Sequence, residues 1–591
     1  MKKKERRQLI ILGLITLICI GAVFAILKYV RINPSAPPEI SATKISAAII
    51  PHHDLAKNLR ADLLKKVGAS DNYNAVRTVI LVSPDHFNAG NSPVTTTDKE
   101  WRLENAIVPA DKNKIDRLVS SNIVSNQESA FSREHGITNI LDDIANDFPN
   151  AGLIPIIIKQ NVSRETIVQL NVELNNICTQ NCLLLASVDF SHYQPGSLAE
   201  IHDRLSLRAL ANLDEELIWK AEVDSQQALA LAIRWAKANE TQNFHLEENT
   251  NSAKLANEPD SESTSYVSGW YQSGEPQRIE DEITFMIGGD AMFGRYIAYK
   301  FRNNLTRSIE NLGERFFGGT DASIINLEGP ISTYPVLINI DPENLVFNFP
   351  PETANVLKWL NLNAVSLANN HALNAGYSGL QNTQKVLSQK GIVAIGDPNH
   401  LGLQEFSQGN SKLTILTINV SGTSTNISEP IRQAKENNSF VIVFPHWGSE
   451  YAQTHNSSQS RLAHQWIDAG ADLIVGSHPH VIQDAEIYNN KPIIYSLGNL
   501  LFDQTFSRET QQGLVLAGKI TDEKLTLVFL PIAIKNYQPE LLQETEKLTI
   551  INKLKKSLGF DVPASPASLA ESRPAGGSQE NYGYDMIEIT R

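Results

Sequence analysis

The chain has 591 residues, of which 42% are hydrophobic and 20% charged, and its formal net charge at pH 7 is -14. A chain of this length is too long to fold around a single hydrophobic core, so the sequence predicts about two to four globular domains. The negative balance argues against a nucleic-acid partner held by broad electrostatic attraction. A polyanion can still be bound where cations reverse the local field.

The N-terminal segment has the pattern of a membrane anchor. A basic cluster at Lys2–Arg7 precedes an uncharged apolar run, Leu9–Leu27, which as a helix would span roughly 28 Å. We expect residues 1–8 to be a cytoplasmic flank and residues 9–30 a single transmembrane helix, because basic flanks stay inside. This predicts a single-pass protein of the cell membrane with both domains extracytoplasmic. The alternative is a cleaved signal peptide, for which the run is long and lacks a nearby small-x-small site.

A Pro-rich linker at 31–44 leads into a first α/β stretch, residues 45–271. Amphipathic patterns predict helices such as Leu55–Val67 and Ala228–Ala238, and the polar segment Glu247–Thr264 predicts a long surface loop. Short β-rich apolar runs predict strands at Ala47–Ile50, Val79–Val82, Leu153–Ile158 and Leu183–Val188.

Two of the three cysteines lie close together in this stretch. Cys178 and Cys182 are near enough in sequence to form a small-loop disulfide. The alternative is a pair of reduced thiols at the start of a buried strand, and the sequence leaves both open.

A second α/β stretch follows at residues 279–558, and a Pro-, Ser-, Ala- and Gly-rich tail at 563–591 is predicted to be disordered. Alternating strands and helices indicate βαβ units, hence a sheet with helices on its faces. The predicted strands are Ile283–Ile287, Ser323–Ile325, Ala364–Leu367, Val441–Phe444, Leu473–Val475 and Ile493–Ser496.

Polar side chains follow these strands directly. Because ligands of open α/β sheets bind beyond the carboxyl ends of the strands, we expect these side chains to converge. Carboxylates, an amide oxygen and imidazoles together suit divalent ions such as Mn²⁺, Zn²⁺ or Fe²⁺, and two such ions can activate water and neutralise an oxyanion. The candidate residues at these strand ends are Asp290, Glu328, Asn369, Asn370, His371, His446, His478 and His480.

Six ordered motifs of the second stretch resemble the CapA family, the metallophosphoesterase-like proteins of poly-γ-glutamate capsule synthesis. The resemblance implies a metallophosphoesterase-like α/β sandwich. Its metal ligands would be Asp290, Glu328, Asn370, His446, His478 and His480. The motifs are Gly288–Arg295, Asn326–Glu328, Ala368–His371, Pro445–Glu450, Gly476–Val481 and Ser496–Asp503.

The same resemblance implies two catalytic residues. His371 would donate a proton to the leaving group, and Arg295 would bind a substrate carboxylate or phosphate, unless it forms a structural ion pair. The chain departs from the superfamily pattern in lacking an Asp-x-His motif near Asp290 and in carrying Glu328 where a second Asp is usual. One of the two metal sites is therefore expected to be altered.

The first stretch resembles the Memo family, also called AmmeMemoRadiSam system protein B, whose fold is similar to class III extradiol dioxygenases. Histidines again follow predicted strands, and the resemblance implies His52, His86 and His192 around a metal ion, with His135 and Asp189 nearby. Memo proteins commonly supply a cysteine after the last histidine motif, but no cysteine follows Cys182 here, and the corresponding region offers Asp224. We expect this site to bind metal more weakly than the second.

Together these resemblances imply a capsule-synthesis protein of two α/β domains, most simply a metal-dependent hydrolase or amide-handling factor. The implied partners are poly-γ-glutamate or a similar anionic polymer and the membrane subunits of capsule synthesis. The alternatives are a metal-dependent phosphoesterase of the envelope and a non-catalytic subunit for polymer assembly or export. The sequence leaves open the substrate, the metal and the oligomeric state.

Overall fold

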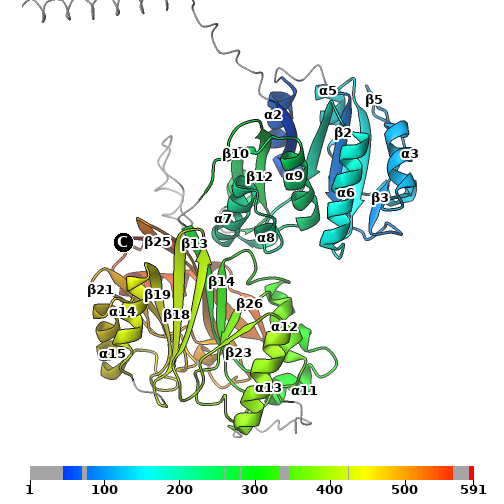
Figure 1. Ribbon diagram of the computed structural model, residues 1–591. Helices are drawn as coiled ribbons and strands as arrows, with labels where there is room; N and C mark the ends of the chain where they lie inside the picture. The colour runs from blue at the N-terminus through cyan, green and yellow to red at the C-terminus, as the bar shows by residue number, and fades with distance from the viewer. Residues whose placement is uncertain are drawn as a thin grey trace, which may run out of the picture.

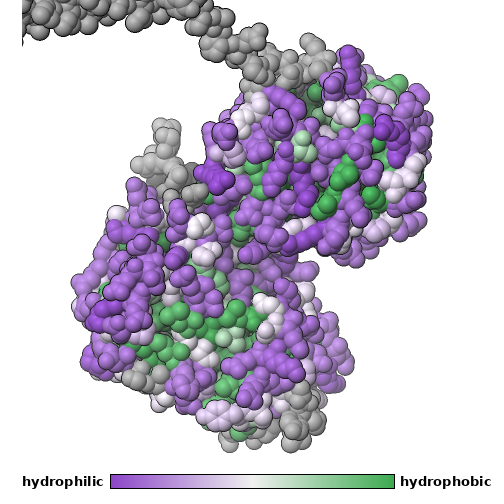
Figure 2. All heavy atoms as spheres, in the orientation of Figure 1, coloured by the Kyte–Doolittle hydropathy of each residue, from purple (hydrophilic) through white to green (hydrophobic). Residues whose placement is uncertain are grey.

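The computed structural model describes residues 44–69, 76–258, 261–279, 282–332, 345–422, 425–562 and 585–591. They form two α/β domains, residues 44–279 and residues 282–591 (Figure 1). In the view of Figure 2 the surface of both is mostly hydrophilic. The α/β fold class predicted for each half is confirmed.

An eight-stranded sheet forms the centre of the first domain. Its strand order is β10-β12-β1-β8-β2-β7-β3-β6, and the neighbours β1, β8, β2 and β7 run parallel. Buried, β-branched runs are typical of such parallel strands. The bounds are β1 Ile45–Ile50, β2 Thr78–Pro84, β3 Val94–Thr96, β6 Ser125–Asn126, β7 Gly152–Ile158, β8 Cys182–Ser187, β10 Asn243–Asn251 and β12 Ser265–Gln272.

Helices cover both faces of this sheet, because successive strand residues point to opposite sides. Ala47 and Ile49 of β1 pack with one set of helices, whereas Ala48 and Ile50 pack with the other. The first set is α3 Lys112–Ser120, α6 Arg164–Ile177, α7 Gly196–Asn212 and α9 Gln226–Ala238, and the second includes α2 Lys57–Gly68 and α5 Leu141–Asp147.

The second domain contains two sheets. The larger has the order β16-β15-β14-β13-β24-β25-β26, with β23 beside β13 and β27 beside β25, and the smaller has the order β17-β18-β19-β20-β22-β21. The larger comprises β13 Glu282–Ala291, β14 Ala322–Leu327, β15 Ala364–Ser366, β16 Val393–Ile395, β23 Asn499–Leu501, β24 Gln512–Thr521, β25 Lys524–Lys535, β26 Gln538–Leu541 and β27 Met586–Thr590. The smaller comprises β17 Gly402–Gln408, β18 Ser411–Asn419, β19 Ser439–His446, β20 Leu473–Val475, β21 Ala485–Tyr488 and β22 Lys491–Ile494.

The two sheets pack face to face with helices outside them. Ile283 and Phe285 of β13 share a buried cluster with Phe440 and Ile442 of β19, which places this core between the sheets. The alternate residues of β19 instead pack against the outer helices α14 Ser428–Glu436 and α15 Ser457–Asp468. The outer face of the larger sheet is covered by α11 Arg295–Lys300, α12 Thr353–Trp359 and α13 Gly376–Gln389. This is the predicted α/β sandwich.

Helix α7 joins the two domains. Leu198 and Ile201 on α7 belong to a buried cluster of the second domain. Arg204 on the same helix donates to Glu282 of β13 at 2.8 Å. Figure 1 shows α7, together with α8 Glu215–Ile218, on the side of the first domain that faces the second. In the first domain a disulfide joins Cys178 and Cys182, which decides between the two alternatives left open by the sequence.

The predicted single-pass membrane localisation is contradicted. Within the described ranges, no helix combines the length and the apolar character needed to cross a bilayer. The anchor predicted at residues 9–30, with its flank and linker, lies outside the described residues.

Two polar segments differ from their predictions. Glu247–Thr264 was expected to be a loop, but its start completes β10, which pairs with β12, and Ser252–Ala256 form helix α10. Of the tail predicted to be disordered, residues 563–584 lie outside the described residues, whereas β27 pairs with β25. In both places pairing with a neighbouring strand satisfies backbone groups that the polar composition alone does not place.

Candidate metal centres

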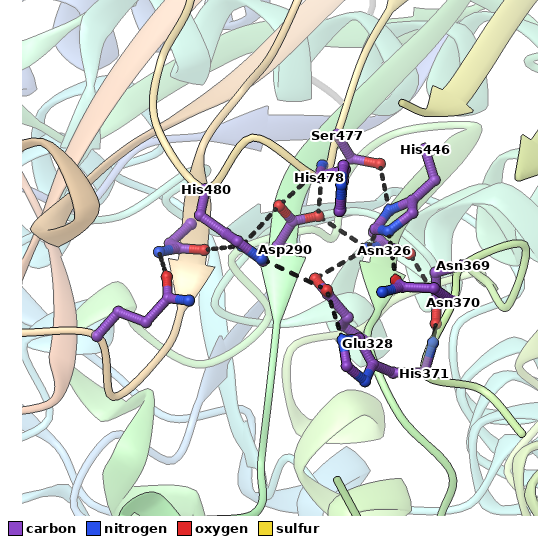
Figure 3. A network of polar contacts seen from close by, with 12 residues as sticks. Asp290, Asn326, Glu328, Asn369, Asn370, His371, His446, Ser477, His478 and His480 are labelled. Atoms are coloured by element: carbon purple, nitrogen blue, oxygen red, sulfur yellow. Dashed lines mark hydrogen bonds and ion pairs between the residues drawn. The ribbon is translucent and has the colours of Figure 1, made fainter. Parts of the chain in front are cut away.

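The predicted residues of the second domain converge at the carboxyl ends of parallel strands (Figure 3). Strands β13, β14 and β15 run parallel in one sheet, and β19 and β20 run parallel in the other. Asp290, Glu328 and Asn370 therefore meet the histidines that follow β19 and β20. Three overlapping groups have ligand atoms within 4.8 Å of one another: Glu328, His446 and His478; Glu450, His478 and His480; and Asp290, Glu328 and His480.

Asp290 lies at the centre of this network and is fully buried. It accepts hydrogen bonds from Asn326 Nδ2 at 2.7 Å and from the backbone N–H of His478 at 3.0 Å. His480 Nδ1 lies 3.3 Å from Asp290 Oδ2, the oxygen that accepts the hydrogen bond from His478. His478 and His480 both have left-handed backbones, with φ of 97° and 60°, a conformation that costs free energy in non-glycine residues and is found at functional sites.

The histidine rings are oriented toward the centre by their outer nitrogens. His480 Nδ1 lies 3.0 Å from Asn499 Oδ1, which leaves Nε2 facing Glu328 Oε1 at 3.6 Å. His446 Nε2 lies 2.8 Å from Asn370 Oδ1. The contact of His480 with Asn499 is typical of the outer contacts of metal ligands, whereas Asn370 is itself a predicted ligand.

Burial and mutual charge shift the pKa values of these groups strongly. Burial raises the pKa of Glu328 well above its usual value. Burial alone would lower the pKa of His480, but Glu328 and Asp290 outweigh it and raise that pKa to about 9. Burial, followed by the neighbouring histidines, lowers the pKa of His446 and of His478. A divalent cation would favour carboxylates and neutral imidazoles at the same place.

The donor set fits such a cation on a separate observation. Glu328 Oε1 and His478 Nδ1 are buried atoms without a hydrogen-bond partner in the described structure. Buried polar atoms are almost always paired, so two unpaired ligand atoms in one cluster indicate a missing partner. A cavity of about 200 Å³, lined in part by His446, Trp447 and His478, lies beside them. The residues present therefore suit a divalent metal.

His371 lies at the edge of this cluster. Its Nε2 is 3.9 Å from Glu328 Oε1, and its ring stacks on Phe347 with centroids 4.0 Å apart. Its Nδ1 lies 3.0 Å from Asn374 Oδ1, which also accepts from the Phe347 N–H, so Nδ1 is the donor and Nε2 faces the centre. Burial lowers the pKa of His371 to about 4.

The contacts of Arg295 are those of a structural ion pair, the alternative to substrate binding. Its guanidinium forms a buried ion pair with Asp503 and lies over the rings of Phe347 and Phe502 at 4.9 and 5.7 Å. The role of substrate binding for Arg295 stays a prediction, as do the ligand roles of the six residues and the proton transfer by His371.

A second cluster lies at the strand ends of the first domain. The ligand atoms of His52, His86 and His135 lie within 4.8 Å of one another. Asp224 Oδ2 is 3.3 Å from His52 Nε2 and 3.6 Å from His86 Nε2. Asp189 Oδ2 is also 3.3 Å from His52 Nε2. The buried Asp224 Oδ1 has no hydrogen-bond partner among the described residues, so this donor set also suits a cation.

Asp224 and the histidines of this cluster shift one another's pKa values. Burial would raise the pKa of Asp224, but His86, His52 and His192 outweigh that effect and lower it. Burial lowers the pKa of His52 to about 3. Asp224 and Glu134 outweigh burial at His86 and raise its pKa to about 10. His192 is influenced by Asp224 and His86 but is not part of the three-histidine group, in which His135 takes its place.

Sequence reasoning gave no role to three neighbours of these centres. Glu450 was part of a motif, Asp224 was noted only as the replacement of a cysteine, and Glu134 was adjacent to a candidate. Glu134 Oε1 lies 2.5 Å from His86 Nδ1. All three residues lie in loops, where the spacing of residues along the chain does not predict which side chains come together.

Comparisons with known proteins identify both halves. The family model of the bacterial capsule synthesis protein PGA_cap matches residues 284–406 and 398–504, and that of Memo-like protein matches residues 24–270. The PGA biosynthesis protein CapA of Bacillus subtilis is 30% identical over 318 residues, covering 49% of this chain and 83% of that protein. The capsule biosynthesis protein CapA of Bacillus anthracis is 26% identical, covering 44% and 70%. A MEMO1 family protein of Methanosarcina barkeri is 27% identical, covering 30% and 65%.

The PGA_cap match lies within the second domain and contains the motifs around Asp290 and His478, and the Memo match covers most of the first domain. The chain belongs to the CapA family of bacterial capsule synthesis proteins, with a Memo-like domain as its N-terminal half.

Proposed function

We propose that this protein serves poly-γ-glutamate capsule synthesis and that its second domain is a metal-dependent hydrolase acting on γ-glutamyl amide bonds. The observation that carries the proposal is the convergence of Asp290, Glu328, His446, His478 and His480 with unpaired buried ligand atoms. Relatives of this chain are named for the biosynthesis of this polymer and of capsules.

The chemistry of poly-γ-glutamate suits such a centre. Each repeat carries a free carboxylate beside the amide bond, so the polymer is a polyanion. A chain of net charge -14 would repel it, unless cations at the site reverse the local field. Bound divalent ions would supply a water of lowered pKa and neutralise the developing oxyanion.

The residues of the chain would then orient the reaction. Asn370 and His446 hold each other at 2.8 Å, and the backbone of His478 is fixed by Asp290. His371 presents an unprotonated Nε2 at the edge of the cluster, where it can accept a proton from the attacking water and pass it to the departing nitrogen. Arg295 holds Asp503 and the ring of Phe347 on which His371 stacks, and so supports the position of His371.

The test uses the purified protein loaded separately with Mn²⁺, Zn²⁺ or Fe²⁺. Poly-γ-glutamate, a chromogenic γ-glutamyl amide, and phosphate mono- and diesters are offered as substrates. We expect γ-glutamyl hydrolysis that is lost in His478→Ala and kept in His464→Ala, a matched histidine that pairs with Glu486 away from the cluster.

Two other results would replace this proposal. Hydrolysis of phosphate esters alone would favour an envelope phosphoesterase. Metal-dependent binding of the polymer with no hydrolysis of any substrate would favour a non-catalytic role in polymer assembly.

A further inference from the structure

Asp224 reaches the histidine cluster of the first domain from an irregular segment. Residues 219–225 connect α8 to α9 and belong to no strand. Two hydrogen bonds with Asp189 fix the end of the segment: Asp224 N donates to Asp189 O, and Asp189 N donates to Asp224 Oδ2, both at 3.1 Å. The position of the rest of the segment depends on what packs against it.

Within the first domain, Gln226 Nε2 donates to Trp219 O at 3.2 Å and to Ala221 O at 2.8 Å, and the second domain adds further donors to the same segment. Arg315 Nη2 donates to the carbonyl oxygens of Ala221 at 2.9 Å and Lys220 at 3.3 Å. The N–H of Gly319 donates to the same Lys220 oxygen at 3.2 Å. Both donors belong to the loop 313–319 that precedes β14.

Arg315 is itself firmly held in the second domain. Its N–H donates to Trp359 O at 3.0 Å, and its carbonyl accepts from Gly318 N at 2.6 Å. Its side chain therefore extends across the boundary from a fixed backbone.

The same loop also approaches the other acidic motif of the cluster. Gly319 has φ of 68°, and a Cβ there would lie 2.9 Å from the ring of His202, so only glycine permits this approach. His202 Nδ1 lies 3.1 Å from Ser191 Oγ, two residues beyond Asp189. Loop 313–319 thus packs behind the segments that supply both Asp224 and Asp189.

We propose that Arg315 of the second domain positions Asp224 among the histidines of the first domain, so that the first centre is complete only when the two domains are docked. Arg315 is a positioning residue, because it touches the segment and not the cluster. The first centre then holds a divalent cation through His52, His86 and the Asp224 carboxylate, a nitrogen and oxygen donor set without thiolate. This goes beyond the proposed hydrolysis and does not depend on it.

The experiment measures zinc binding to the full chain in which His446→Ala and His478→Ala silence the second centre. Elemental analysis after dialysis at fixed free Zn²⁺ gives the dissociation constant of the first centre. We expect Asp224→Asn to abolish most binding. Arg315→Ala should raise the dissociation constant about 10- to 100-fold, the usual effect of removing an outer contact of a metal site.

Two further variants complete the design. Arg315→Lys keeps the charge but replaces the planar fork that reaches the carbonyl oxygens of Ala221 and Lys220, so it should weaken binding in the same direction but less. Arg307→Ala is the matched control, since this exposed arginine of the same region contacts Glu310 and should leave binding unchanged. If Arg315→Ala does not fold, Arg315→Lys alone decides.

Several results would overturn the proposal. One is an unchanged dissociation constant in Arg315→Ala, or in Arg315→Lys where that variant decides, while Asp224→Asn loses zinc. Another is the absence of zinc in the silenced parent. A third comes from Arg315→Ala made in the otherwise unaltered chain: equal metal loss from the second centre would show a general loss of fold.

Discussion

Replacing His371 and His478 separately should distinguish a proton-transferring residue from a metal ligand. His478→Ala removes a ring whose Nδ1 is buried and unpaired and which lies with its centroid 4.5 Å from that of His446. We expect metal occupancy to fall, and activity to fall with it. His371→Ala should leave the metal content unchanged, because this ring lies at the edge of the cluster and 3.9 Å from the nearest carboxylate oxygen.

The expected size for His371→Ala follows from its proposed task. Loss of a positioned general acid or base usually slows a reaction about 10²- to 10⁴-fold, which corresponds to about 3–5 kcal/mol of activation free energy. The ring is well placed for the upper part of this range, because Asn374 fixes Nδ1 and Phe347 stacks on one face.

The assay combines elemental analysis with hydrolysis of substrates that have good and poor leaving groups. A good leaving group needs no proton, so the defect of His371→Ala should shrink toward that of the unaltered protein with such substrates. Equal metal loss in both variants, or full activity of His371→Ala on a poor leaving group, would refute the distinction between the two roles.

Three further predictions concern stability and metal content. Arg208 is buried against Asp321 and donates to Glu282 O. Arg208→Ala should therefore lower the free energy of unfolding by about 3–5 kcal/mol, because it leaves a buried charge unpaired. Arg508→Ala, at an exposed ion pair, should lower it by at most about 1 kcal/mol, and thermal denaturation compares the two. A Cβ on Gly289 would lie 2.0 Å from the backbone oxygen of Gly498, so Gly289→Ala should displace Asp290 and reduce metal content, and normal loading would contradict this. Burial raises the pKa of Asp203 to about 7. The folded state then binds this proton more tightly than the unfolded chain, so stability is lost as pH rises from about 4 to 7. Asp203→Asn should remove up to about 3 kcal/mol of the difference in unfolding free energy between pH 5 and pH 8.

Much of the fold and of the second centre follows from short-range patterns. Apolar runs such as Val79–Val82 and Leu473–Val475 predict strands because burial on both faces selects β-branched residues. The strand-end rule then predicts convergence, and the structure brings Asp290 and His478 together although 188 residues separate them.

What the sequence could not predict depends on contacts between distant segments. Strand β10 is polar, and it forms because β12 offers a partner for its backbone; strand propensity is set largely by such neighbours. His135 was expected only near the first metal site, but it belongs to the three-histidine group, whereas His192 does not. Helix α4 His135–Thr138 brings it there by its contacts with β2. No pattern within either segment carries that information.

The absence of a thiolate changes how the two centres relate to each other. With a cysteine ligand, the first centre would prefer softer ions than the second. Without a thiolate, both present imidazoles and carboxylates, joined in the second by the amide oxygen of Asn370, and Asp224 and Glu328 each contribute a buried oxygen without a hydrogen-bond partner among the described residues. Similar donor sets select the same borderline ions, so both centres should draw on one metal pool. Differences in occupancy must then come from geometry, and at the first centre the geometry of Asp224 is tied to Arg315 on the other domain.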